Sequence, residues 1–256
     1  MAERTWHSVS EDRKGGRILN QLFLAALQGA TEFLPVSSSG HLLLFSNLLQ
    51  VNIDLQMVVM LHAGSLLAIV LLVYRGIFRA LKNWRILINL LISTLPAMLV
   101  GLLFEEQVES VFSSLSFLPF FFIVTAVFLL LASLKDGDRS LDQMSPKHAL
   151  LIGLFQAIAV LPGVSRSGMV LSAALLLDYR REESVTYTFL MAIPVLLGAS
   201  LLKLGEASLA MNLAFLVSFL SSLLALVVLK KVVLVRKLRW FAYYCLFIAF
   251  LSFLLG

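Results

Sequence analysis

Charged residues and cysteine are both scarce in this sequence. Asp, Glu, Lys and Arg make up 14% of the 256 residues, whereas a soluble domain has about 25%. This shortage excludes an ordinary soluble domain. The single cysteine, Cys245, excludes an intrachain disulfide and leaves the redox compartment open.

Apolar residues take the place of the missing charges. They make up 60% of the chain, and the mean hydropathy is +0.95, which indicates an integral membrane protein. The net charge of +5 does not indicate a nucleic-acid partner, because the Lys and Arg residues lie in short loops between apolar runs, as the positive-inside rule describes. We therefore expect membrane lipid around the chain and no nucleic acid.

The first apolar run resembles a signal peptide, since Arg13 and Lys14 precede residues 18–26 as an n-region precedes an h-region. We reject that interpretation because the run continues directly into a motif that occurs twice, and cleavage near Ala30 would destroy one copy. Residues 1–16 are expected to form a polar, poorly ordered tail.

A polar motif occurs twice among these apolar runs, and the two copies lie 128 positions apart. The first copy reads Gln28-Gly-Ala-Thr-Glu-Phe-Leu-Pro-Val-Ser-Ser-Ser-Gly-His41, and the second reads Gln156-Ala-Ile-Ala-Val-Leu-Pro-Gly-Val-Ser-Arg-Ser-Gly168. Polar and ionisable groups at membrane depth are costly, so they are interpreted as functional by default. The chain therefore has two related candidate sites, or two halves of one site.

The apolar runs predict an all-α fold, a polytopic membrane helix bundle in a single domain over residues 1–256. Six runs are long enough to span a membrane: residues 56–74, 86–104, 117–134, 185–204, 213–229 and 240–255. In each motif a proline stops the helix, and a second short apolar run follows. Each copy therefore predicts a re-entrant helical hairpin, formed by residues 18–34 with 41–49 and by residues 149–161 with 169–177.

The loop charges and the order of the elements predict an inverted repeat. Basic loops predicted to be cytoplasmic contain Arg75, Arg79, Lys82, Arg85, Lys135, Arg139, Lys147, Lys230, Lys231, Arg236, Lys237 and Arg239, and an acidic loop predicted to face outward contains Glu105, Glu106 and Glu109. Three spans separate the hairpins, so each half, about residues 17–134 and 148–256, has one hairpin and three transmembrane helices in opposite orientations. The hairpin tips should meet near the midplane.

The two tips carry the groups of an anion site. Residues 37–40 and 165–168 precede helix starts, where free N–H groups and hydroxyls converge. Arg166 adds a planar fork that suits a phosphate. Gln28 and Glu32 share a helix face, and Glu32 can hold a divalent metal together with phosphate oxygens. The motif therefore predicts a phosphate or diphosphate site.

Purely structural interpretations stay open for several residues. The serines can be helix N-caps, and Glu32 with Arg166 can be a satisfied internal ion pair. His62 lies in a long apolar run without polar neighbours in sequence, and we interpret it as a hydrogen-bonded packing residue. Residues 178–183 are interpreted as a solvated interfacial turn.

The first motif resembles the (E/Q)-x-x-x-E motif and following serine-glycine-histidine of the undecaprenyl-diphosphate phosphatases, the BacA or UppP family of bacterial inner membranes. Residues 162–170 resemble the family's P-G-x-S-R-S-x-x-T motif, with Val170 in place of Thr, and Met191-Ala-Ile-Pro194 also fits. The resemblance covers nearly the whole chain.

The resemblance implies hydrolysis of a C55 polyprenyl diphosphate to the monophosphate and phosphate in a multi-pass inner-membrane enzyme. This reaction recycles the lipid carrier for peptidoglycan synthesis and cell-wall biogenesis, confers bacitracin resistance, and depends on Mg²⁺ or Ca²⁺. The functional positions carry over as Gln28, Glu32, Ser38, His41 and Arg166. The sequence leaves the oligomeric state open and allows a homodimer.

The candidate residues fall into three groups, and Glu32 belongs to two of them. The catalytic residues are Glu32, Ser38 as nucleophile or phosphate ligand, His41 as acid/base partner, and Arg166; the phosphate-binding residues are Ser37, Ser39, Gly40, Ser165, Ser167 and Gly168; the metal ligands are Glu32 and Gln28. Whether a phosphoserine forms or water attacks directly stays open.

Three other functions compete with this hypothesis. A lipid-phosphate flippase or anion transporter needs the same arginine and helix ends but no nucleophile. An acid-phosphatase-like (PAP2) lipid phosphatase needs a further histidine, and none follows Arg166. A non-catalytic membrane scaffold needs none of these groups.

Overall fold

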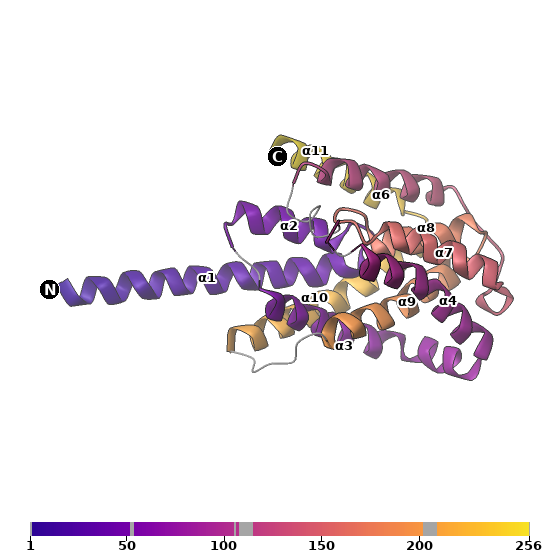
Figure 1. Ribbon diagram of the computed structural model, residues 1–256, viewed down its shortest axis with the longest axis horizontal. Helices are drawn as coiled ribbons and strands as arrows, with labels where there is room; N and C mark the ends of the chain where they lie inside the picture. Colours follow the sequence, from indigo (N-terminus) through magenta and orange to yellow (C-terminus); the bar gives the residue numbers. More distant parts are fainter. Residues whose placement is uncertain (1, 52–53, 105, 108–114, 202–208, 256) are drawn as a thin grey trace.

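The computed structural model describes residues 2–51, 54–104, 106–107, 115–201 and 209–255 (Figure 1). The regular structure of this part is helical, with one isolated β-bridge between Arg139 and Tyr179. Its elements are α1 (Ala2–Phe33), α2 (Ser38–Leu48), α3 (Leu55–Lys82), α4 (Trp84–Leu103), α6 (Leu118–Ser133), the 3₁₀ helix η1 (Leu141–Gln143), α7 (Pro146–Ile158), α8 (Arg166–Leu176), α9 (Arg181–Leu201), α10 (Leu209–Leu234) and α11 (Arg239–Leu255). The expected all-α class is confirmed.

Four of the described helices, α3, α4, α9 and α10, are long and apolar enough to cross a membrane. They are rich in Leu, Val and Ile, and many of these side chains lie exposed on the outside of the bundle. Water would not tolerate so much exposed apolar surface, whereas lipid does. The chain is therefore a membrane protein. The end of the run at 185–204 lies partly outside the described residues, as do Glu105 and Glu109.

Both motif helices end close to the predicted points. Helix α1 ends at Phe33, two residues before Pro35, and α7 ends at Ile158, four residues before Pro162. Proline has no N–H to continue the helix and disfavours helix in the residue before it. At its other end α1 begins at Ala2 (Figure 1). This stretch contains no proline, but Gly15 and Gly16 lower its helix propensity. The poorly ordered tail stays a prediction.

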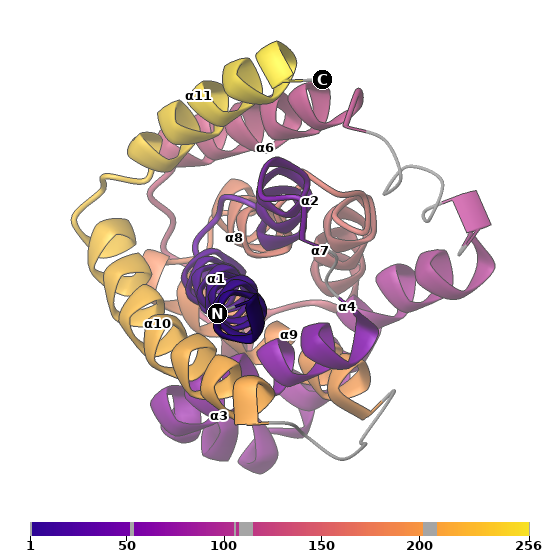
Figure 2. The same cartoon turned by 90° about the vertical axis from the view of Figure 1, so that its left-hand side faces the viewer.

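Helices of the two halves pack against each other. Figure 2 shows α2, α7, α8 and the end of α1 lying inside a ring that includes α3, α4, α6, α10 and α11. Helix α1 packs along α10, and α7 packs along α4. The main neighbour of α1 and of α7 is therefore a long helix from the other half of the sequence. This packing holds the polar motifs in the middle of the bundle.

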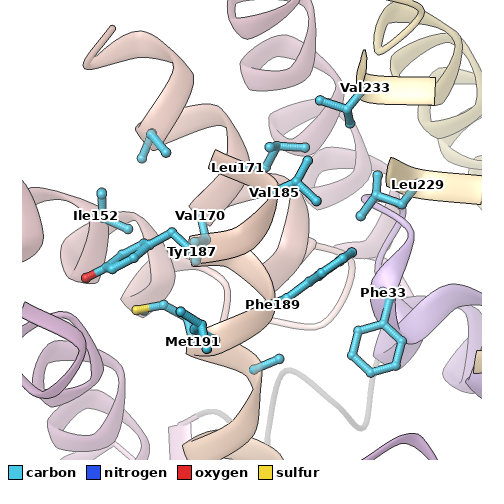
Figure 3. Close-up of a cluster of buried hydrophobic side chains, with 14 of the residues drawn as sticks. Phe33, Ile152, Val170, Leu171, Val185, Tyr187, Phe189, Met191, Leu229 and Val233 are labelled. Carbon is cyan, nitrogen blue, oxygen red and sulfur yellow. The ribbon is translucent and has the colours of Figure 1, made fainter. Parts of the chain in front are cut away.

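Helix α9 connects these layers through buried aromatic side chains (Figure 3). Phe189 packs edge to face on Phe33 of α1, with 6.3 Å between the ring centroids. The Tyr187 hydroxyl donates to the Asn89 carbonyl at 2.9 Å and lies 2.6 Å from the Ser93 hydroxyl of α4. An edge-to-face pair contributes about 0.5–1.5 kcal/mol beyond burial, so these contacts hold α9 against the end of α1 and against α4.

The interpretation of residues 178–183 as a solvated turn is wrong for two of its charged side chains. Arg181 and Glu183 are each only 8% exposed. Arg181 donates to the carbonyls of Ser133 at 3.3 Å and Lys135 at 2.6 Å, at the end of α6, and Glu183 accepts from Arg79 of α3 at 3.0 Å. Arg181 is buried because helix ends meet here and leave carbonyls that need donors, and Glu183 is buried against the Arg79 guanidinium.

Candidate active site

A serine before each of the short helices α2 and α8 caps that helix. Ser37 Oγ accepts from the Gly40 N–H at 3.3 Å before α2, and Ser165 Oγ accepts from the Gly168 N–H at 3.1 Å before α8. The N-cap interpretation is therefore confirmed for Ser37 and Ser165. The same device in both copies directs two helix N-termini, with their partial positive charge, toward one region.

The two turns before these helices touch each other. The Gly163 N–H donates to Ser37 Oγ at 3.1 Å, and Ser167 Oγ donates to the Leu34 carbonyl at 3.0 Å. A Cβ added to Gly40 would lie 2.8 Å from Gly163 Cα. Gly163 itself has φ of 97°, in the left-handed region that favours glycine. Only glycine at these positions allows the two turns to approach so closely.

The Glu32 carboxylate lies at the centre of the contact between the two motifs. Its Oε2 accepts from Gln28 Nε2 and from Ser38 Oγ, both at 2.7 Å, and its Oε1 accepts from Arg166 Nη2 at 2.7 Å. Arg166 Nη1 also donates to the Ala192 carbonyl of α9 at 3.3 Å. The acid of the first motif and the cation of the second are therefore one ion pair, buried within the bundle.

A cavity of about 180 Å³ opens beside this ion pair, and we call it the central cavity. Of the residues singled out from the sequence, it is lined by Glu32, Ser37, Ser38, Ser39, Ser165 and Arg166. Gly40, Ser167 and Gly168 lie behind this lining and hold the two helix starts together, while Gln28 lines an adjoining pocket. The structure thus brings most of the candidate residues to one cavity.

His41 is the candidate that lies away from the cavity lining. It is fully buried, its Nδ1 donates to the Ser37 carbonyl at 2.7 Å, and its Nε2 accepts from the Tyr244 hydroxyl at 2.8 Å. These contacts support a positioning role for His41, because they hold Ser37, the residue that caps α2. The acid/base role of His41 stays a prediction.

His62 of α3 is a cavity residue that our sequence interpretation missed. Its Nδ1 donates to the Val58 carbonyl at 2.9 Å, which turns Nε2 to within 3.5 Å of Gln28 Nε2 and 3.9 Å of Glu32 Oε2. The expected hydrogen bond of His62 is confirmed, but its side chain has polar neighbours from α1 that the sequence of α3 does not show. The rule that ionisable residues inside apolar spans are functional would have selected His62, had it been applied beyond the repeated motifs.

Val170, at the position where the family motif has Thr, is 1% exposed and belongs to the apolar core. It is not among the residues that line the central cavity.

The arrangement is suited to binding a phosphate group. Two helix N-termini, the Arg166 guanidinium and serine hydroxyls can all donate to phosphate oxygens. Ser38 Oγ also donates to a carboxylate, which is the contact that activates a hydroxyl nucleophile. An anion carrier needs the first set of groups but not the second.

The family model described as "Bacitracin resistance protein BacA" matches residues 21–251. The chain belongs to the BacA family. The match contains both motifs and every residue that lines the central cavity. The resemblance inferred from the motifs is therefore confirmed.

The BacA-family relatives of this chain carry the same name. A protein of Thermotoga petrophila named undecaprenyl-diphosphatase is 47% identical over 236 residues, 92% of this chain and 99% of its own. Proteins of the same name from Thermosipho africanus and Methanococcus vannielii are 41% and 39% identical, covering 93% and 89% of this chain and 100% and 96% of their own. This chain is thus similar to these BacA-family proteins over nearly its whole length.

Proposed function

We propose that this chain is a membrane hydrolase that converts undecaprenyl diphosphate to undecaprenyl phosphate and inorganic phosphate. The observation that carries the proposal is the convergence of Glu32, Ser38 and Arg166, from the two motifs, on one buried cavity. The shared name of the relatives points to the same reaction. Its cellular roles would be recycling of the lipid carrier for cell-wall synthesis and bacitracin resistance, the second of which the family's name states.

The substrate's terminal phosphate would bind between the two helix starts. Arg166 pairs with Glu32 in the structure, and a phosphate in the central cavity would compete for the same guanidinium. The contact of Arg166 with the Ala192 carbonyl keeps the side chain anchored while it turns to the phosphate. Preorganised donors of this kind stabilise the charge that develops in the transition state.

Ser38 and Glu32 would supply the chemistry. Glu32 takes the proton of Ser38, whose oxygen forms a bond to the terminal phosphorus while the bond from that phosphorus to the bridging oxygen breaks. Undecaprenyl phosphate leaves, and water then cleaves the phosphoserine to give inorganic phosphate. The distance of 2.7 Å between Ser38 Oγ and Glu32 Oε2 is within reach of this proton transfer.

We propose Glu32 and Gln28 as the ligands of a divalent cation, Mg²⁺ or Ca²⁺. Gln28 Oε1 is buried without a hydrogen-bond partner, next to the Glu32 carboxylate, so an oxygen ligand is free at this point. No cluster of three or more His, Cys, Asp or Glu suited to a metal occurs among the described residues. The protein ligands therefore fit a cation that also takes phosphate oxygens, and such an ion would neutralise phosphate charge.

We further propose six membrane spans, formed by α3, α4, α6, α9, α10 and α11, and two re-entrant hairpins, α1–α2 and α7–α8, in a bacterial inner-membrane protein. Helix α6 has 16 residues and α11 has 17, about 24–26 Å at 1.5 Å per residue. Both fall short of an average bilayer core of about 30 Å, a mismatch that local thinning accommodates. Helices α2 and α8, with 11 residues each, are too short for that. The homodimer stays a prediction.

Phosphate release from undecaprenyl diphosphate by the purified protein in detergent tests the function. Ser38→Ala and Glu32→Gln should each reduce the rate at least about 10²-fold, the range of a lost general base. Ser46→Ala is the matched control, because Ser46 lines an adjoining pocket and donates only to the Leu43 carbonyl of its own helix. Full activity in either site variant would exclude the Ser38–Glu32 mechanism.

A second readout separates attack by Ser38, which forms a phosphoserine, from direct attack by water. Rapid quenching with a substrate labelled on the terminal phosphorus should trap label on Ser38 if the phosphoserine forms. If Ser38→Ala remains active while Glu32→Gln is inactive, water attacks directly. The transporter alternative predicts no phosphate release at all in detergent, and neither the relatives' names nor the Ser38–Glu32 contact favours it.

A further inference from the structure

The central cavity adjoins two larger pockets. One pocket, of about 340 Å³, lies between α4 and α9 and shares Ala159, Val160, Arg166 and Val195 with the central cavity. The other, of about 380 Å³, lies between α2 and α3 and shares Ser38, Ser39 and His62 with it. We call them the α4–α9 pocket and the α2–α3 pocket. A diphosphate in the central cavity thus has two available exits for the chain attached to it.

The α4–α9 pocket has the wall of a hydrocarbon site. Beyond the residues it shares with the central cavity, its lining is Thr94, Ala97, Met98, Gln156, Pro194 and Gly198. Met98 is 48% exposed, and the neighbouring Leu95 and Leu197 are 47% and 46% exposed. The pocket therefore continues outward onto apolar surface, where a lipid chain can pass from protein to bilayer without crossing a polar rim.

Gly198 leaves part of this wall empty. A Cβ added at Gly198 would meet no atom within 4 Å, so the space beside it is open rather than filled by a neighbouring helix. Pro194 of α9 lines the pocket, and Pro96 lies within α4, the facing helix. Each proline interrupts the hydrogen bonds of its own helix. The two helices thus have local reasons to leave a gap here.

The α2–α3 pocket has a different lining. Five of its eight lining residues are Gln28, Ser38, Ser39, Ser46 and His62. Leu42, Leu43 and Val58 complete the lining, so much of this pocket is apolar as well. Gln28 is a proposed metal ligand, and a cation held by Gln28 and Glu32 would occupy the end of this pocket that meets the central cavity. The α4–α9 pocket contains Arg166 and no proposed metal ligand, so it is the more favourable place for a prenyl chain.

We propose that the α4–α9 pocket binds the prenyl segment next to the diphosphate. This binding makes the enzyme selective for long prenyl chains over short ones such as C5. The inference rests on the proposed function. Arg166 lines both the central cavity and this pocket, so a diphosphate held by its guanidinium would place the attached carbons at the pocket entrance. At about 340 Å³ the pocket falls at the small end of the range for ligand sites, about 300–1,000 Å³. It accommodates the first prenyl units and leaves the rest of the chain in lipid.

Filling the pocket at Gly198 tests the proposal. Gly198→Ala, Gly198→Val and Gly198→Leu form a graded series, and Gly101→Leu is the matched control, because Gly101 has equally open surroundings but lies outside the pocket lining. The substrates are a C15 and a C5 prenyl diphosphate in detergent. For Gly198→Leu we expect kcat/KM to fall about tenfold or more with the C15 substrate, mainly through KM, and to stay within about threefold with the C5 substrate.

Several outcomes would overturn the proposal. Equal kinetics of Gly198→Leu and Gly101→Leu with the C15 substrate would mean that the chain does not pass Gly198. An equal loss with both substrates would mean that the variant disturbs the phosphate site. A chain-selective loss in Ser46→Leu but not in Gly198→Leu would place the chain in the α2–α3 pocket. If the unmodified enzyme released no phosphate from any prenyl diphosphate, the proposed function itself would fail.

Discussion

The contact between the two motif turns makes Gly40→Ala the sharpest test of the site's construction. A Cβ at position 40 would lie 2.8 Å from Gly163 Cα and 2.8 Å from Cζ of Phe122. Carbon atoms in favourable contact are about 3.5–4.0 Å apart, so at least about 0.7 Å of overlap must be relieved. Backbone lies on one side and a buried ring on the other, so the two turns must move apart.

The expected magnitude follows from this overlap. Overpacking of one methyl group in a well-packed core costs about 1–3 kcal/mol, and we expect the free energy of unfolding of Gly40→Ala to fall by that amount. Ser38 and Arg166 begin the two helices that would separate, and a displacement of about 1 Å in an active site can cost about 10²-fold in rate. A shift of about half that size should reduce kcat/KM for phosphate release about tenfold.

The assay combines thermal unfolding in detergent with phosphate release per folded molecule. Gly101→Ala is the control, because a Cβ there meets nothing within 4 Å, and replacing glycine within a helix should stabilise by about 0.5–1 kcal/mol. Gly168→Ala should be intermediate, since its Cβ would lie 3.3 Å from Pro35 Cβ of the opposite turn. If Gly40→Ala were as stable and active as Gly101→Ala, the close contact between the turns would not be needed.

Three further variants test individual side chains. Arg181→Met removes the donors to the carbonyls at the end of α6 and should lower the free energy of unfolding by about 1.5–3 kcal/mol, measured by denaturation in detergent; an unchanged midpoint would refute this anchoring. Tyr244→Phe removes the donor to His41 Nε2 and should cost about 1 kcal/mol with turnover within about threefold, whereas a far larger loss of kcat would support the acid/base role of His41. His62→Leu should weaken Mg²⁺ affinity about tenfold, measured by the metal-dependent shift in unfolding temperature; an unaltered shift would place the metal away from His62.

The sequence predicted the local features of the site well. The proline stops, the two helix starts and their serine caps all follow from short-range rules of backbone geometry, and the structure has them at residues 33–40 and 158–168. The repeat and the family resemblance led to the correct family because they depend on residues close together in the chain. The pairing of Glu32 with Arg166 was considered only as an alternative, and the structure shows it as a direct contact.

The errors concern residues whose surroundings are set by distant segments. His62 had no polar neighbours along α3, but α1 places Glu32 and Gln28 beside it. Arg181 and Glu183 look like an exposed turn in sequence, yet the ends of α3 and α6 bury them. Neither local propensity nor hydropathy contains this information, because both properties sum over neighbours in sequence.

What the sequence by itself determined is the membrane environment, the helices and the chemical groups at the two motifs, since composition, apolar run length and proline position act locally. Only the tertiary structure decided which groups meet. It joined the acid and serine of one motif to the arginine of the other, added His62, tied His41 to Tyr244, and opened an apolar pocket beside Arg166. The physical reason is that these contacts depend on the packing of α1 on α10 and of α7 on α4. Gly29 and Gly153 allow these two close approaches, and no single segment encodes them.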